Sequence, residues 1–209
     1  MQPFDPERFR IVVQLSSAPA TLDIAERLNK LARRSADHRK ELLAAAAVAA
    51  ATALAQAVDA ALLNLAGNEW GEAEVDSTDP REGSLGELFN LTFRQKVLRL
   101  PRILSHNQLR FKDGHSVTQA LNQLIDRRNR LVHIVDEPHL VTGDHSSVRF
   151  TDDQRMEIQV PIPPHPWHAV SEPDATQYIE AVREYLEHIA SAPLGSATLE
   201  QLPFLERVH

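Results

Sequence analysis

The spacing of apolar residues indicates helices over most of this chain. Four stretches carry leucine, isoleucine, valine or alanine at steps of three and four, which places these side chains on one face of a helix. The stretches are about residues 21–34, 35–65, 117–136 and 174–190. Three of the predicted faces consist of Leu22, Ala25, Leu28 and Leu31; of Ala47, Ala51, Leu54, Val58, Ala61 and Leu65; and of Tyr178, Ile179, Val182, Tyr185, Leu186 and Ile189. Because alanines let helices approach closely, we expect the second helix to be the centre of a bundle.

Capping residues and prolines predict where several helices begin and end. Ser35 or Asp37 is placed to cap the second helix, which Gly67 would end, since short oxygen-bearing side chains accept hydrogen bonds from the first turn. A further helix is predicted over about residues 85–100, ended near Pro101 because proline lacks a backbone N–H.

The segment before the helix predicted at residues 117–136 contains two local signals. Residues 101–115 carry no clear apolar period and are predicted to be irregular, ending in a turn at Asp113 and Gly114. Ser116 and Gln119 have the spacing of a capping box and are predicted to begin the helix that ends before Pro138.

Alternating apolar residues predict a small amount of β structure. Residues 147–162 alternate around a polar turn and are expected to form a hairpin, which could pair with a short strand at residues 8–15. Residues 67–86 are predicted to be an acidic loop, and the tail after Pro193 is expected to be loosely held. The fold class predicted is mainly α, a helical bundle with a small β-hairpin or sheet addition.

The length of 209 residues fits one domain. We expect a core bundle at residues 21–136, a hairpin addition at 145–163 and a last helix at 174–190. The N-terminus carries charge and proline where a signal peptide needs an apolar run. The alanine-rich stretch 42–65 contains Asp59, which is costly in a membrane, so we expect a cytoplasmic protein with no membrane partner.

Composition and charge exclude several classes of function. The chain has no cysteine, which excludes disulfides, thiolate metal sites and cysteine nucleophiles. It has 7 glycines and no Gly-rich phosphate-loop pattern. The net charge of −7 argues against a basic coat for nucleic acid, yet residues 94–133 hold nine Lys or Arg and two acids, a local charge of +7.

That basic stretch ends in the segment RRNRLVH, residues 127–133. The apolar face of its helix consists of Val117, Leu121, Leu124, Leu131 and Val135. The same spacing of three and four places Arg128 on this face, where a guanidinium is costly unless it meets an anion, a partner or solvent. Arginine forks clamp phosphate oxygens and histidine transfers protons near neutral pH, so Arg128 and His133 form a candidate site for phosphodiester chemistry.

The residues Arg128-Asn129-Arg130-Leu131-Val132-His133 resemble the HEPN family, whose motif is often Arg-Asn-x-x-x-His in the second half of a helix in a helical bundle. Arg followed by His at a permissive spacing is expected about 2.6 times by chance, as in Arg33 to His38 and Arg110 to His115; requiring Asn and a fixed spacing lowers this to about 0.03. The resemblance covers mainly residues 21–136.

The resemblance implies a metal-independent endoribonuclease of a prokaryotic toxin or phage-defence system, working as a homodimer with RNA as substrate and no cofactor. His133 would be the general acid or base, Arg128 would hold the scissile phosphate, and Asn129 would orient the phosphate or His133. Arg127 and Arg130 are predicted to bind further RNA phosphates. An antitoxin or regulatory protein is a further partner that the family implies.

Two features argue against parts of this assignment. Five residues at about 100° each place Arg128 and His133 roughly 140° apart on an ideal helix, so either the helix is distorted or a second subunit completes the site. HEPN toxins that a nucleotidyltransferase regulates carry Tyr two residues after the motif His, where this chain has Val135. Regulation by nucleotide transfer onto that position is therefore not expected.

Simpler interpretations of these residues remain open. Arg128 could pair with a carboxylate of another helix, and His133 could complement the negative end of its own helix. The alternative function is a non-catalytic HEPN-like interaction module or a nucleotide-binding regulatory module. His165 and His168 have a spacing that a metal could use, but the sequence offers no third ligand nearby, so we predict no metal site.

Overall fold

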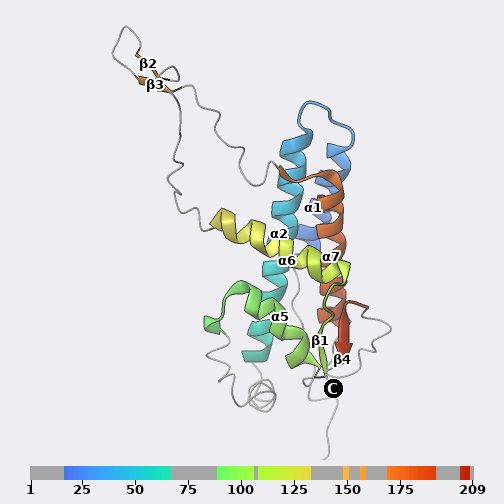
Figure 1. Ribbon diagram of the computed structural model, residues 1–209. Coiled ribbons are helices and arrows are strands. Elements are labelled where there is room, and N and C mark those ends of the chain that lie inside the picture. The colour runs from blue at the N-terminus through green and yellow to red at the C-terminus, as the bar shows by residue number, and fades with distance from the viewer. Residues whose placement is uncertain are drawn as a thin grey trace, which may run out of the picture.

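The protein is described by a computed structural model, which covers residues 17–66, 89–105, 108–132, 148–150, 156–158, 169–191 and 203–207. This part of the chain is mainly helical with a small amount of antiparallel sheet, as predicted (Figure 1). The elements are α1 (Ala18–Ala32), α2 (Arg39–Ala66), α5 (Phe93–Leu104), β1 (Leu109–Phe111), α6 (Ser116–Val132), β2 (Val148–Phe150), β3 (Met156–Ile158), α7 (Glu172–Ser191) and β4 (Leu205–Arg207).

Helix α2 is the centre of the bundle. Helices α1 and α7 run alongside it, α6 crosses in front of them, and α5 lies beside the second half of α2 (Figure 1). The predicted face of α2 is confirmed, since all six of its residues are buried. Further alanines on other sides of α2, among them Ala46, Ala50, Ala53 and Ala57, are fully buried as well, because neighbouring helices surround it.

Within the described ranges, α2 is long and apolar enough to cross a membrane by length and composition. More than half of its apolar window is buried inside the protein, against the other helices.

The face of α1 differs from the prediction. Its buried residues are Ala18, Leu22, Ala25, Asn29 and Ala32, while Leu31 is half exposed. The small side chains on this buried side of α1 allow it to lie close to the alanines of α2. The predicted face is confirmed at Leu22 and Ala25, and Leu28 packs partly buried against the core, but the prediction was wrong for Leu31, because the shape of a close helix contact and not hydrophobicity alone decides which residues turn inward.

Helix α7 and the first half of α6 follow the predicted pattern. All six predicted apolar residues of α7 are buried, and Tyr178 and Tyr185 are fully so. On α6, Val117, Leu121 and Leu124 are buried, whereas the side chain of Leu131 and all of Val135 lie outside the described residues. The predicted end of this helix before Pro138 also lies outside them.

The predicted caps of α2 and α6 are wrong. Helix α2 begins at Arg39, beyond both Ser35 and Asp37, after the turn that follows α1. At the start of α6, the Val117 N–H donates to Nδ1 of His115 at 3.3 Å, so His115 and not Ser116 supplies the side-chain acceptor. The turn before it is as predicted, and Gly114 adopts a φ of 78°, which favours glycine.

The capping box of this chain is at the start of α5. Thr92 is extended, with φ −62° and ψ 154°, and its side chain accepts from the Gln95 N–H while the Gln95 side chain accepts from the Thr92 N–H. Helix α5 therefore begins at Phe93. The helix predicted from about residue 85 is interrupted at residues 91–92, whereas residues 89–90 are helical and residues 85–88 lie outside the described part.

Pro101 lies inside α5 and does not end it, contrary to the prediction. Proline has no N–H, so the carbonyl of Val97, four residues earlier, lacks its donor within the helix. The hydroxyl of Tyr185 in α7 donates to this carbonyl oxygen at 3.1 Å. A tertiary hydrogen bond thus replaces the missing helical one, and the helix continues to Leu104.

Strands β1 and β4 form an antiparallel pair that the sequence did not predict. Leu109 and Phe111 are buried, and Phe111 packs 5.9 Å from Phe204, measured between ring centroids. Arg110 pairs with Glu206 across the strands at 2.7 Å. Residues 101–115 are therefore not irregular throughout, and residues 203–207 of the tail are held in place, because aromatic contacts cover the end of α7.

Strands β2 and β3 pair antiparallel within the predicted hairpin, with Arg149 opposite Glu157. Figure 1 labels the two strands. The other segment of the predicted sheet, residues 8–15, lies outside the described residues, as do the acidic loop 67–86 with Gly67, and the segment containing His165 and His168.

His188 of α7 makes stability depend on pH. Its side chain is fully buried with the edge of Phe204 packed against it, and burial lowers its pKa from 6.5 to about 4. Between these values the unfolded chain binds a proton that the native state excludes. The free energy of unfolding should therefore fall as pH drops from 6.5 to 4, by about 3 kcal/mol in total.

Chemical denaturation of the wild type and a His188→Leu variant at several pH values tests this expectation. The stability difference between pH 7 and pH 4.5 should be smaller in the variant, whatever its stability at pH 7. Parallel pH profiles for the two proteins would show that carboxyl groups, and not His188, cause the loss at low pH.

Candidate functional site

The structure describes part of the predicted site. Arg127, Arg128 and Asn129 lie in the last turns of α6, and all three side chains are half-buried. His133 and the side chain of Arg130 lie outside the described residues. The position of His133 relative to Arg128 therefore lies outside the described residues. Whether both side chains can reach one atom stays a prediction.

Arg128 contacts an aromatic ring. Its guanidinium carbon lies 4.6 Å from the centroid of the Phe93 ring, the geometry of a cation–π contact. One terminal nitrogen also donates to the side-chain oxygen of Asn129 at 3.2 Å. Among the residues that the structure describes, Arg128 forms no ion pair with a carboxylate, so the carboxylate pairing considered above is not seen there.

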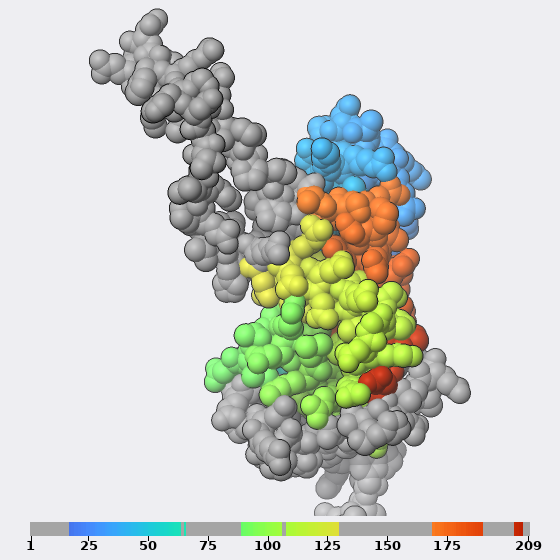
Figure 2. All heavy atoms as spheres, viewed as in Figure 1, coloured from blue at the N-terminus to red at the C-terminus, as the bar shows by residue number. Residues whose placement is uncertain are grey.

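The position of Phe93 follows from local and tertiary contacts. The Thr92–Gln95 capping box fixes Phe93 as the first residue of α5. Arg94, the next residue, pairs with Asp126 of α6 at 2.5 Å and so holds the start of α5 beside the end of α6. Figure 2 shows the two helices side by side on one face of the molecule.

Phe93 is the residue of this site that sequence reasoning missed. A capping box at Thr92-x-x-Gln95 was visible in the sequence and would have placed Phe93 at a helix start. The contact with Arg128 joins residues 35 positions apart, however, and no local pattern predicts such a pair.

Arg127 points to a different helix from Arg128. Its Nε donates to the hydroxyl of Tyr178 in α7 at 2.9 Å, and a terminal nitrogen lies 3.8 Å from Asp174. Burial raises the pKa of Tyr178, and the hydrogen bond from Arg127 opposes this effect. Arg127, which was predicted to bind RNA phosphate, thus links α6 to α7. It shares neither the Phe93 contact nor the Asn129 contact of Arg128.

Acidic partners reduce the positive charge of the basic stretch. Of its nine Lys and Arg residues, three pair with acids in the described part of the chain: Arg94 with Asp126, Arg110 with Glu206, and Arg127 with Asp174. Two of these acids come from outside the stretch. The local charge counted from sequence, +7, therefore overstates the field that a bound nucleic acid would meet.

The arginines of the two other Arg-to-His spacings each pair with a carboxylate. Arg33 lies against Glu172 and Arg110 against Glu206, while His115 caps α6. Within the described residues there is no group of three His, Asp or Glu side chains that could hold a metal ion. The arrangement around Arg128 can bind an oxyanion through guanidinium and amide groups.

Comparison of the chain with protein-family models, with curated proteins and with solved structures finds no match. The function is therefore inferred from its own residues and their contacts.

Proposed function

We propose that this protein is a metal-independent endoribonuclease with Arg128, Asn129 and His133 as its catalytic residues. The observation that carries the proposal is the environment of Arg128. Its guanidinium lies half-buried on the apolar side of α6, with an aromatic ring and an amide as neighbours. Such a charge is costly to retain for stability alone, and an anionic ligand supplies the missing countercharge.

The geometry of the cation–π contact supports phosphate binding. The guanidinium carbon lies over the Phe93 ring, and a ring accepts no conventional hydrogen bond, so this contact leaves the N–H donors of arginine for other partners. Asn129 uses one donor, which leaves others for two phosphate oxygens. The contact with the ring restricts the Arg128 side chain before a ligand binds, so less side-chain entropy is lost when the phosphate binds.

In the proposed reaction, a histidine removes the proton of a ribose 2′-hydroxyl, and that oxygen attacks the adjacent phosphorus. The bond to the 5′-oxygen of the next nucleotide breaks, and this oxygen takes up a proton from a protonated histidine of the site. The products are a cyclic phosphate and a 5′-hydroxyl end. Arg128 stabilises the charge that develops on the phosphate oxygens, an effect worth about 100- to 1000-fold in rate for a single well-placed donor.

The proposal includes a homodimer. Arg128 and His133 would diverge on an ideal helix, and a second copy of the chain would bring His133 of one copy to Arg128 of the other. An RNA-cleaving activity of this kind suits a prokaryotic toxin or phage-defence system in the cytoplasm, with an antitoxin or regulatory protein as a further partner. These assignments rest on the HEPN resemblance of residues 128–133.

The test is RNA cleavage in excess EDTA by the wild type and by His133→Ala. We expect the wild type to cleave at an undiminished rate and the variant to be about 100- to 10,000-fold slower, since general acid–base catalysis contributes about that much. Fragments should carry cyclic phosphate ends. Absence of cleavage by the wild type on any RNA, or equal rates for both proteins, contradicts the proposal, and inhibition by EDTA points to a metal.

A further inference from the structure

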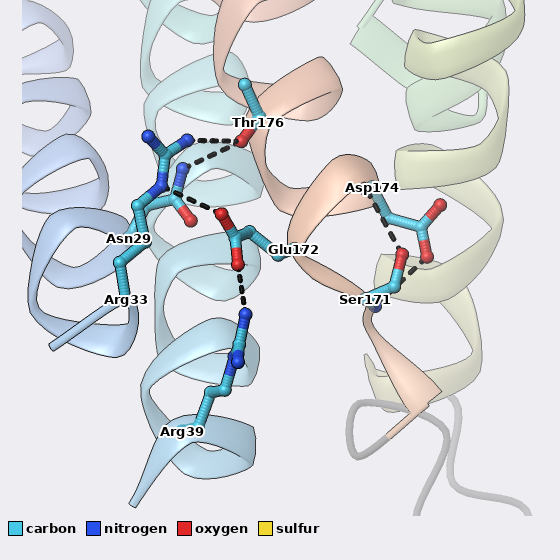
Figure 3. Close-up of polar contacts among 7 residues, drawn as sticks. All are labelled: Asn29, Arg33, Arg39, Ser171, Glu172, Asp174 and Thr176. Carbon is cyan, nitrogen blue, oxygen red and sulfur yellow. Dashed lines mark hydrogen bonds and ion pairs between the residues drawn. The ribbon is translucent and has the colours of Figure 1, made fainter. Parts of the chain in front are cut away.

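A second cluster of basic residues lies where the turn between α1 and α2 meets the start of α7. A groove of about 730 Å³ is present there, and Arg33, Arg39 and Lys40 line it. Figure 3 shows Arg33 and Arg39 extending from α1 and α2 toward α7. The three cations come from one short stretch of sequence, but only the packing of α7 turns them into the wall of a groove.

The carboxylate of Glu172 lies between the two arginines. One of its oxygens is 3.0 Å from Nε of Arg33, and the other contacts a terminal nitrogen of Arg39 (Figure 3). The carboxylate thus occupies the position that an oxyanion would take between two guanidinium groups. Lys40 lines the same groove and, within the described residues, has no ion-pair partner.

Thr176 adds an uncharged donor to this wall. Its hydroxyl oxygen accepts hydrogen bonds from the Asn29 side chain at 3.0 Å and from Arg33 at 3.3 Å (Figure 3). Because both contacts use the oxygen as an acceptor, its own proton is left to be donated. Asn29 is buried and holds the hydroxyl from behind. Because the Thr176 hydroxyl lines the groove and can donate its proton, the groove favours a ligand rich in hydrogen-bond acceptors.

The contacts of Glu172 are weak enough to be exchanged. The Arg33 and Arg39 side chains are 51% and 52% exposed, and ion pairs at such exposure contribute about 0–1 kcal/mol each. A phosphate group carries more charge than a carboxylate and offers more oxygens to arginine forks. Even with Glu172 and Glu180 counted, the five charged residues that line the groove sum to 3 − 2 = +1.

We propose that this groove binds a small phosphorylated ligand and that Glu172 is its internal competitor. Binding would swing the Glu172 carboxylate away and place a phosphate between Arg33 and Arg39, with a second phosphate near Lys40. The volume suits a diphosphate-bearing molecule of nucleotide size, within the range of about 300–1,000 Å³ of small-molecule sites. The site is separate from Arg128 and does not depend on RNA cleavage.

Pyrophosphate is the probe for this site, titrated into the full chain by calorimetry at constant ionic strength. We expect saturable binding by the wild type, about tenfold tighter binding by Glu172→Gln, and at least about tenfold weaker binding by Arg39→Gln combined with Lys40→Gln. Arg27→Gln removes a charge from an exposed position of α1 that does not line the groove, and its affinity should stay within about twofold of the wild type.

Three results would overturn the proposal. One is the absence of pyrophosphate binding by both the wild type and Glu172→Gln. Another is an equal loss of affinity in Arg27→Gln and in the double variant, which would show a general effect of charge. The third is that the double variant loses affinity for a short single-stranded RNA while pyrophosphate does not bind. His133→Ala should bind pyrophosphate like the wild type, so failure of the ribonuclease proposal leaves this test intact.

Discussion

Replacing Arg128 with methionine is expected to slow RNA cleavage about 100- to 1000-fold, because the developing charge on the phosphate loses its principal donor. Stability should change little, since methionine keeps a long side chain on the apolar side of α6 and its sulfur packs well against the Phe93 ring. Cleavage rates and chemical denaturation of the same preparations measure the two effects separately.

Arg27→Met is the matched control for this substitution, because it removes an arginine from the exposed side of α1. Its cleavage rate should equal that of the wild type. If Arg128→Met cleaves as fast as Arg27→Met, Arg128 has no part in catalysis, even where the wild type is an active ribonuclease.

Phe93 is a positioning residue in the same experiment. Phe93→Leu keeps an apolar contact but removes the π face, so kcat should fall about three- to tenfold with little change in KM, and Phe93→Tyr should restore it. In NMR spectra, we expect the ring to shift the side-chain resonances of Arg128 upfield in the wild type and not in Phe93→Leu. Unchanged Arg128 resonances would refute the contact, whether or not RNA is cleaved.

Replacing Tyr185 with phenylalanine is expected to lower the free energy of unfolding by about 1–3 kcal/mol. The ring itself can remain stacked on Phe111, whose centroid is 6.4 Å away, so the loss comes from the hydroxyl. Without it, the buried carbonyl of Val97 has neither the helical donor that Pro101 removes nor the tertiary donor that replaces it. Urea denaturation gives the difference.

A double-mutant cycle with Pro101→Ala identifies the cause. Alanine supplies an N–H that can bond to the Val97 carbonyl within the helix, so Tyr185→Phe should cost clearly less in the Pro101→Ala background. An equal cost in both backgrounds would mean that the hydroxyl stabilises the protein in some other way. The single variant Pro101→Ala also reports how far the proline itself strains α5.

The resemblance of residues 128–133 to the HEPN motif is a local property, and Arg128 could be selected from sequence because one charge interrupts a regular apolar pattern. The contacts of Arg127, the preceding residue, could not be predicted in this way. Arg127 and Arg128 are adjacent and chemically identical, yet one binds Tyr178 of α7 and the other stacks on Phe93 of α5. The direction of each side chain depends on which helix packs on either side of α6.

By itself, the sequence determined the helical class of the protein, the buried faces of α2 and α7, and the turn at Gly114, because helical period and backbone preference are local. Only the tertiary structure decided that Asn29 and Ala32, and not Leu31, complete the buried side of α1, why α5 passes through Pro101, and that residues 205–207 pair with 109–111. Each of these depends on a partner distant in sequence: the alanines of α2, the hydroxyl of Tyr185, and the aromatic ring of Phe204. The Tyr185 hydroxyl supplies the hydrogen-bond donor that Pro101 removes from α5, and the other two partners fill space beside α1 and at the end of α7.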